Sequence, residues 1–170
     1  GWPSAACRGF VLGSGRVIGD QSLVYQVEQA PGAAAHMHER GDLEEWKARV
    51  SSLCVGNPML ALGVSIAFAG PLLEPLQVDG GGVHFRGESS TGKTTTSRAA
   101  VSVWGAPGLM ATWRATSNGL EGIAAIANSS LLALDEIGEV SAREAGGTAY
   151  MIANGRGKQR AARTGTARPS

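Results

Sequence analysis

Hydrophobic residues in the first forty positions come in short runs that are separated by glycine and polar residues. Apolar runs at 10–12 and 17–18 flank a Gly-Ser-Gly turn, and this arrangement predicts a pair of strands. Residues 23–25 offer a further strand. Residues 29–41 show no periodicity, so we expect them to form a loop.

The next forty residues contain two helix starts. Asp42 followed by Glu45 is typical of a capping box. Asn57-Pro58 predicts a second start, because asparagine caps well and proline suits the first helical position. This helix runs through the mostly apolar stretch Met59–Leu73 and is expected to end near Pro71. The stretch suits a buried helix, since a membrane span needs about 20 residues, and we expect no association with a membrane.

After three glycines at 80–82, predicted strands and helices alternate. The strands are expected at 83–86, 109–112 and 130–134. The helices are expected at 93–104, from a cap formed by Asn118 and Glu121, and from a cap formed by Ser141 and Glu144 through Ile152. Alternation of this kind predicts a parallel sheet flanked by helices, which is an α/β fold. We therefore divide the chain into an N-terminal β-hairpin and helical segment, 1–79, and an α/β core, 80–170.

Residues 87–94 match the phosphate-loop pattern GxxxxGK[ST], known as Walker A. Glycines let the backbone wrap around a phosphate, and a helix start adds unpaired N–H groups to the same site. Lys93 is expected to reach the β- and γ-phosphates, and the Thr94 hydroxyl to bind Mg²⁺. The alternative is a glycine turn before an ordinary helix. The predicted ATP-binding residues are Gly87, Glu88, Ser89, Ser90, Thr91, Gly92, Lys93, Thr94 and Thr95.

Residues 131–134 are apolar and are followed by two acids, as in a Walker B strand. Such a strand delivers one carboxylate to Mg²⁺, and this assigns Asp135 to the metal. Glu136 is assigned as the general base that polarises the attacking water. Alone, the pattern fits an ordinary strand ending in a solvated acidic turn better than a Walker B strand. It gains weight because Asp135 lies 42 residues after Lys93, with room for a helix, a strand and a helix between them.

The distribution of charge indicates a class of binding partner, and the cysteine content indicates a cellular compartment. Residues 1–155 carry ten basic and fourteen acidic side chains, whereas residues 156–170 carry five basic side chains and no acid. The basic segment 156–168 fits either a nucleic-acid backbone or a solvated charged segment. Two cysteines, Cys7 and Cys54, make no disulfide framework, which favours the cytoplasm. His36 and His38 are expected in a solvated loop without a metal.

The chain resembles the bacterial domain-of-unknown-function family 927, P-loop proteins of phages and mobile elements. The resemblance covers nearly the whole chain, with matches at 9–12, 16–19, 41–46, 67–73, 87–95, 113–116, 118–122, 134–138 and 150–158. It implies a helicase- or primase-like ATPase, DNA as a partner and a homo-oligomer in the full-length protein. P-loop ATPases of this kind continue past Walker B to further strands, and the basic, glycine-rich residues after Gly155 do not predict one. We therefore expect the core to be incomplete at its C-terminal side.

Together the patterns predict Mg²⁺-dependent ATP binding and hydrolysis, coupled to work on DNA. One alternative is a nucleotide-gated binding module with little turnover. Another is a P-loop small-molecule kinase. The Asp135-Glu136 pair favours hydrolysis, because a kinase must orient an acceptor hydroxyl rather than water.

Overall fold

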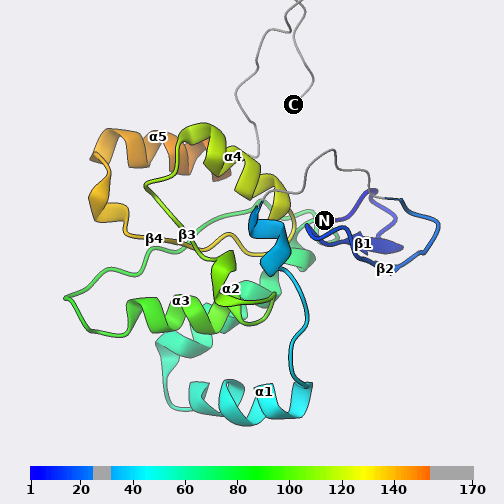
Figure 1. Cartoon of the computed structure of the whole chain (residues 1–170), viewed down its shortest axis with the longest axis horizontal. Coiled ribbons are helices and arrows are strands. Elements are labelled where there is room, and N and C mark those ends of the chain that lie inside the picture. The colour runs from blue at the N-terminus through cyan, green and yellow to red at the C-terminus, as the bar shows by residue number, and fades with distance from the viewer. Residues whose placement is uncertain (25–31, 154–170) are drawn as a thin grey trace, which may run out of the picture.

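The structure is a computed structural model that describes residues 1–24 and 32–153 (Figure 1). Helices dominate it, and the strands are short. Its elements are β1 (Gly9–Val11), β2 (Val17–Gly19), the 3-10 helix η1 (Gly32–His36), α1 (Leu43–Arg49), η2 (Ser51–Cys54), α2 (Pro58–Leu73), α3 (Lys93–Val101), η3 (Pro107–Leu109), β3 (Ala111–Thr112), α4 (Ser117–Ile126), β4 (Leu134–Asp135), η4 (Ile137–Glu139) and α5 (Ala142–Ala153).

The predicted strand pair near the N-terminus is confirmed. β1 and β2 form an antiparallel hairpin in which Phe10 faces Ile18 across the ladder. Phe10 is buried, with its ring edge-on to Trp2 at 4.9 Å and stacked on Trp104 at 6.0 Å between ring centroids. The further strand expected at 23–25 is wrong for its described part, because Val24 is 80% exposed and has no ladder partner.

The loop expected at 29–41 is wrong over residues 32–36, which form the 3-10 helix η1. Ala34 in this helix and Met37 directly after it are buried, and they pack with Ile126 of α4 as a small cluster. A spacing of three residues matches the 3-10 period. One turn of that period is too short for the windows in which helical patterns are recognised.

Both predicted caps of the first two helices are confirmed. Asp42 Oδ1 accepts a hydrogen bond from the Glu45 N–H at 2.8 Å, and Asn57 Oδ1 accepts one from the Leu60 N–H at 3.2 Å. In the described residues no helix combines the length and apolarity that a bilayer crossing requires.

α2 ends near Pro71 as expected, but it passes through the proline and ends two residues later, at Leu73. A proline inside a helix leaves the carbonyl four residues earlier without its N–H donor. That carbonyl belongs to Ala67, and the Trp104 indole donates to it at 2.8 Å. Trp2 in turn donates to the Pro71 carbonyl at 2.7 Å. Trp104 thus supplies the donor that lets the helix pass Pro71. Trp2 supplies a donor to the Pro71 carbonyl, whose helical partner would be the N–H that Pro75 lacks.

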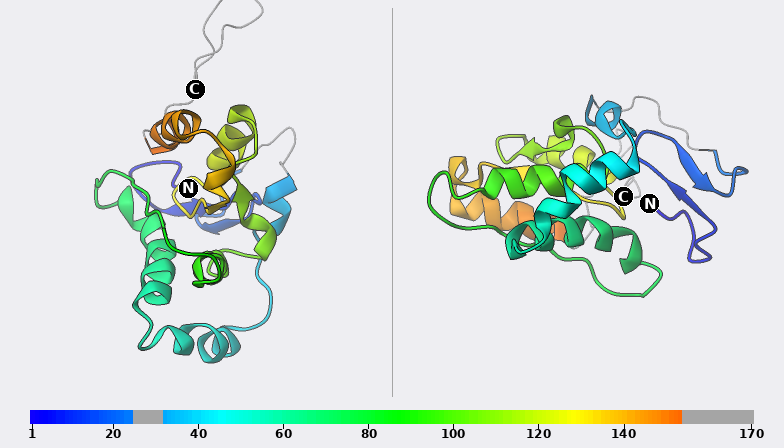
Figure 2. Two further views of the ribbon diagram at one scale, coloured as in Figure 1. Left: turned by 90° about the vertical axis from the view of Figure 1, so that its left-hand side faces the viewer. Right: turned by 90° about the horizontal axis from the view of Figure 1, so that it is seen from below.

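α2 packs closely on α3 through small residues (Figure 2). An added Cβ at Gly63 would lie 2.7 Å from Thr96 Cγ2 of α3. Gly70 lies equally close to a different segment, because an added Cβ there would lie 2.1 Å from the carbonyl oxygen of Ser130, between α4 and β4. α2 also exposes large apolar side chains, namely Met59, Leu62, Phe68 and Leu72. α2 and α3 lie on either side of residue 79, and the predicted domain division at that residue stays a prediction.

β3, α4 and β4 form a βαβ unit with parallel strands, as the alternating pattern predicted. Ala111 pairs with Leu134 and Thr112 with Asp135. The strands are shorter than the expected 109–112 and 130–134. The fold is therefore mixed helix and strand with one parallel pair, compatible with an α/β class.

The strand expected at 83–86 is wrong. Residues 80–87 are irregular and mostly exposed, and Val83 finds no strand beside it among the described residues. A strand without a neighbour leaves its backbone N–H and C=O groups unpaired, so a run with two apolar residues is not enough to form one.

Two helix starts in this half have different outcomes. The cap expected from Asn118 is wrong, because α4 begins one residue earlier and the Thr116 hydroxyl accepts from the Gly119 N–H at 3.2 Å. The cap at Ser141 and Glu144 is confirmed. The Glu144 N–H donates to Ser141 Oγ at 3.2 Å, and Ser141 Oγ donates to Glu144 Oε2 at 2.7 Å. α3 is shorter than the expected 93–104 and ends at Val101.

Candidate functional site

The phosphate-loop sequence forms a concave turn in front of α3. Ser90 and Gly92 have φ angles of 62° and 87°, both in the left-handed region. Gly92 precedes the helix without any side-chain cap, so the first-turn N–H groups of α3 are not satisfied by a cap side chain. A hollow of about 380 Å³ is lined by residues 89–95. Backbone turns of this kind and helix starts both favour anions.

Lys93 lies over its own loop. Its ammonium donates to the Gly87 carbonyl at 2.8 Å and to the Glu88 carbonyl, and it lies 3.5 Å from Thr91 Oγ1. Thr91 Oγ1 also donates to the Glu88 carbonyl at 2.9 Å, which ties the turn together. The positive charge is therefore held at the mouth of the hollow. The other predicted loop residues, Ser89, Ser90 and Thr95, line the same hollow.

Thr94 and Asp135 meet although they are far apart in sequence. Thr94 Oγ1 donates to Asp135 Oδ2 at 3.0 Å in a partly buried position. The other carboxylate oxygen, Oδ1, accepts from the Glu136 N–H at 2.9 Å. α3 supplies the hydroxyl and β4 supplies the carboxylate, so the contact joins the loop to the parallel strand pair. Hydroxyl and carboxylate oxygens are the ligands that Mg²⁺ prefers, and both fit that ion.

Glu136 follows the strand in a strained backbone conformation. Its φ of 65° lies in the left-handed region, which costs a non-glycine residue about 1–2 kcal/mol. The side chain is exposed, and none of the described residues is its hydrogen-bond partner. A strained residue held at the end of a strand, beside a paired carboxylate, is a feature found at functional sites.

No group of three or more His, Cys, Asp or Glu side chains within 1–24 and 32–153 is arranged to hold a metal ion. A magnesium ion at Thr94 and Asp135 would therefore take its remaining oxygen ligands from water and phosphate. His36 and His38 are exposed. His36 is the last residue of the 3-10 helix η1, so the expected loop is wrong for it, whereas His38 lies in the irregular residues that follow.

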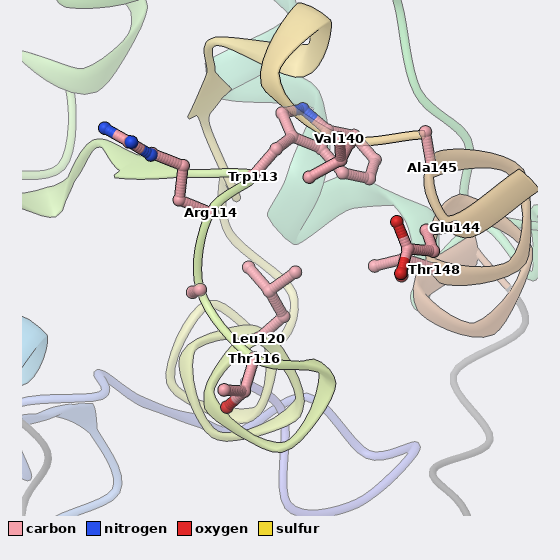
Figure 3. A pocket seen from close by; sticks show the side chains of 9 residues that line it. Trp113, Arg114, Thr116, Leu120, Val140, Glu144, Ala145 and Thr148 are labelled. Carbon is pink, nitrogen blue, oxygen red and sulfur yellow. The ribbon is translucent and has the colours of Figure 1, made fainter. Parts of the chain in front are cut away.

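A second cavity, of about 290 Å³, lies where the chain leaves β3 and β4 (Figure 3). Its walls come from the segment after β3, the segment after β4, α4 and α5. The lining residues are Trp113, Arg114, Ala115, Thr116, Leu120, Val140, Glu144, Ala145 and Thr148. Arg114 pairs with Glu139 at 2.9 Å, in line with an exposed surface arginine. The sequence pattern did not reveal this cavity; its one signal is a tryptophan directly after a strand at the ligand-binding edge.

The family described as "Domain of unknown function (DUF927)" matches residues 1–170. The chain belongs to the DUF927 family. This confirms the resemblance seen in the sequence, and the family description itself names no activity. Among curated proteins and solved structures, nothing matches this DUF927 domain.

Proposed function

We propose that this DUF927 domain binds ATP with Mg²⁺ and hydrolyses it. The observation that carries the proposal is the 3.0 Å hydrogen bond from Thr94 Oγ1 to Asp135 Oδ2. A phosphate-binding helix start and an acidic strand end are each common features. Their side chains touch here across 41 positions of sequence, and that juxtaposition is what a magnesium–triphosphate site requires.

The loop and Lys93 would hold the triphosphate. Backbone N–H groups of the turn and of the first turn of α3 would donate to the phosphate oxygens. The Lys93 ammonium would exchange its carbonyl partners, Gly87 and Glu88, for β- and γ-phosphate oxygens. Thr94 and Asp135 would hold Mg²⁺, which neutralises phosphate charge when bound.

Glu136 would act as the general base. Its free carboxylate would accept a proton from a water molecule whose oxygen forms a bond to the γ-phosphorus. The bond between that phosphorus and the β–γ bridging oxygen breaks, and ADP and phosphate leave. A general base at Glu136 distinguishes hydrolysis from the nucleotide-gated alternative, in which ATP binds and is not turned over. The kinase alternative would need an acceptor hydroxyl in place of that water.

Coupling to DNA is part of the proposal and rests on the family resemblance and on the charge of segment 156–168. That segment lies outside the described residues. Helicase- or primase-like work, and assembly with further copies, are likewise proposed from the resemblance alone.

The deciding experiment measures ATP binding and phosphate release for Glu136→Gln. Glutamine keeps the shape but accepts no proton at neutral pH, so ATP should bind as in the unchanged protein while release falls at least about 100-fold. Glu44→Gln on α1 removes an exposed acid in the same way and should change neither quantity. Each protein is assayed with and without single-stranded DNA. Normal turnover in Glu136→Gln would remove the general base from the mechanism.

A further inference from the structure

One of the four tryptophans does not use its indole N–H within the described fold. The other three donate to protein oxygens: Trp2 to the Pro71 carbonyl at 2.7 Å, Trp46 to Ser102 Oγ at 2.9 Å and Trp104 to the Ala67 carbonyl at 2.8 Å. Trp113 is half-buried, lines the second cavity and finds no acceptor among the described residues. A half-buried indole normally has a partner for its N–H. The Trp113 ring therefore lines the cavity, and its N–H makes no hydrogen bond to the described residues that would stabilise the fold.

The charge that faces this cavity is negative. Glu144 and Thr148 reach it from α5, opposite Leu120 and beside Trp113 and Val140 (Figure 3). Glu144 Oε2 accepts from Ser141 Oγ at 2.7 Å and from the Ser141 N–H at 3.3 Å. Glu144 Oε1 receives no hydrogen bond from the part of the chain that is described.

Arg114 is the basic residue in the cavity's lining, and it pairs with a residue outside that lining. Arg114 points away from the cavity in Figure 3, and its guanidinium pairs with Glu139 at 2.9 Å. Arg143 is exposed and adjoins Glu144 on α5, where successive side chains are about 100° apart around the axis. A ligand that brings a phosphate or a carboxylate would meet the free oxygen of Glu144, whereas a cation would be attracted to it.

Size limits the ligand further. Sites for drug-sized molecules have volumes of about 300–1,000 Å³, and this cavity, at about 290 Å³, lies just below that range. It has room for a group the size of one long side chain and not for a nucleotide. Its apolar walls, Leu120 and Val140, suit an aliphatic stem.

We propose that this cavity binds an alkylammonium or alkylguanidinium group, with the cation on the Trp113 ring and paired with Glu144. Cation–π attraction and a charge-assisted hydrogen bond act together in such a site. The source of the group is either a small free amine or a lysine or arginine side chain of a polypeptide. The proposal is independent of ATP hydrolysis, because none of these residues belongs to the phosphate loop.

The test uses the full chain, ¹⁵N-labelled and without nucleotide, and follows its indole N–H signals by NMR. The Trp113 signal is assigned by its loss in Trp113→Phe. Agmatine, an alkylguanidinium, should shift that signal saturably and leave the signals of Trp2, Trp46 and Trp104 in place. Butylurea has a butyl stem of the same length and a planar head, but it lacks both the guanidinium and the terminal ammonium of agmatine, and it should bind at least about 5-fold more weakly.

The matched variants are Glu144→Gln and Glu45→Gln. Each glutamate is the third residue of its helix after a capping residue, Ser141 and Asp42 respectively, and glutamine serves equally well at that position. Both variants should keep the melting temperature. Glu144→Gln should weaken agmatine binding at least about 5-fold, and Glu45→Gln should leave it unchanged.

Equal affinity for agmatine and butylurea, an equal effect of the two variants, or no shift of the Trp113 signal would each overturn the proposal. The tripeptide Gly-Arg-Gly separates the sources. Tighter binding of the peptide than of agmatine identifies a polypeptide side chain, and the reverse identifies a free amine. Loss of ATP hydrolysis in any variant bears only on the proposed function, because agmatine binding is measured without nucleotide.

Discussion

Four of the five α-helices in the described residues begin with a side-chain cap, whereas α3 begins with a glycine. Asp42, Asn57, Thr116 and Ser141 each accept a hydrogen bond from a backbone N–H of the first turn. Gly92 offers no side chain at the same position of α3. Each capped start therefore has one of its first-turn N–H groups satisfied by a side chain. The start of α3 leaves its first-turn N–H groups without a side-chain acceptor, and this is the helix that carries Lys93 and Thr94.

Two positions of the backbone lack a hydrogen-bond partner for opposite reasons. At Pro71 the chain lacks an N–H, and Trp104 from a distant segment supplies a donor to the Ala67 carbonyl. At Gly92 the chain has N–H groups in excess, and no side chain takes them up. Burial of an unpaired backbone group costs free energy, so the first shortfall must be met inside the fold. The second lies at an exposed loop, where water or an anion can meet it.

The largest expected effect is on hydrolysis, from Lys93→Ala. Removing the ammonium at the mouth of the hollow should lower phosphate release at least about 100-fold and weaken ATP binding about 10-fold. Lys47→Ala removes an exposed lysine from α1, where it pairs with Glu44 at 2.7 Å, and should change neither quantity. Phosphate release and fluorescent-nucleotide titration measure both. Unchanged turnover in Lys93→Ala would show that Lys93 at the start of α3 takes no part in ATP hydrolysis.

Next in size is Gly92→Ala, paired with Gly122→Ala. An added Cβ meets nothing within 4 Å at either position, so only backbone conformation distinguishes them. Alanine at Gly92 must adopt a φ of 87°, which should lower the free energy of unfolding by about 1–2 kcal/mol and weaken ATP binding. Alanine at Gly122, inside α4, should raise the same free energy by about 0.5–1 kcal/mol. Urea denaturation measures both changes, and two changes of the same sign would contradict this account.

A third test concerns the Trp104 indole, which donates a hydrogen bond to the Ala67 carbonyl of α2. Trp104→Phe keeps a ring beside Phe10 but removes the donor to the Ala67 carbonyl, which should cost about 1–2 kcal/mol of unfolding free energy. Pro71→Ala returns an N–H to the helix. The double variant should therefore lose less stability than the sum of the two single ones. A strictly additive result would show that Trp104 acts through packing alone.

The turn before α3 and the acidic end of β4 were predictable from sequence because both are local backbone patterns. Glycines at 87 and 92, and a lysine and threonine after them, specify a turn and a helix start without help from distant residues. The Ser141 cap is local in the same sense, and it is confirmed. The cap of α4 was misplaced by two residues, because Thr116 and Asn118 are both capping types and only the backbone decides between them.

The parts that sequence reasoning missed depend on distant partners. The strand expected at 83–86 needed a neighbour that the described residues do not supply. α2 passes Pro71 because of a donor 33 residues later. The cavity beside Trp113 has walls from four separate segments, and no single stretch of sequence contains it. How two segments meet is decided by packing, which a single sequence pattern does not report.

The smallest expected effect comes from the caps themselves, and it tests the comparison most directly. Asn57→Ala removes the acceptor for the Leu60 N–H at the start of α2, which should lower the free energy of unfolding by about 1 kcal/mol. Asn57→Asp keeps an acceptor oxygen and should restore it. ATP affinity should be unchanged in both, because a capped start donates nothing to a ligand. If Asn57→Ala weakened ATP binding as much as Gly92→Ala does, both variants would be acting through general stability. The glycine at the start of α3 would then be an ordinary turn residue, and the difference between the two kinds of helix start would carry no functional meaning.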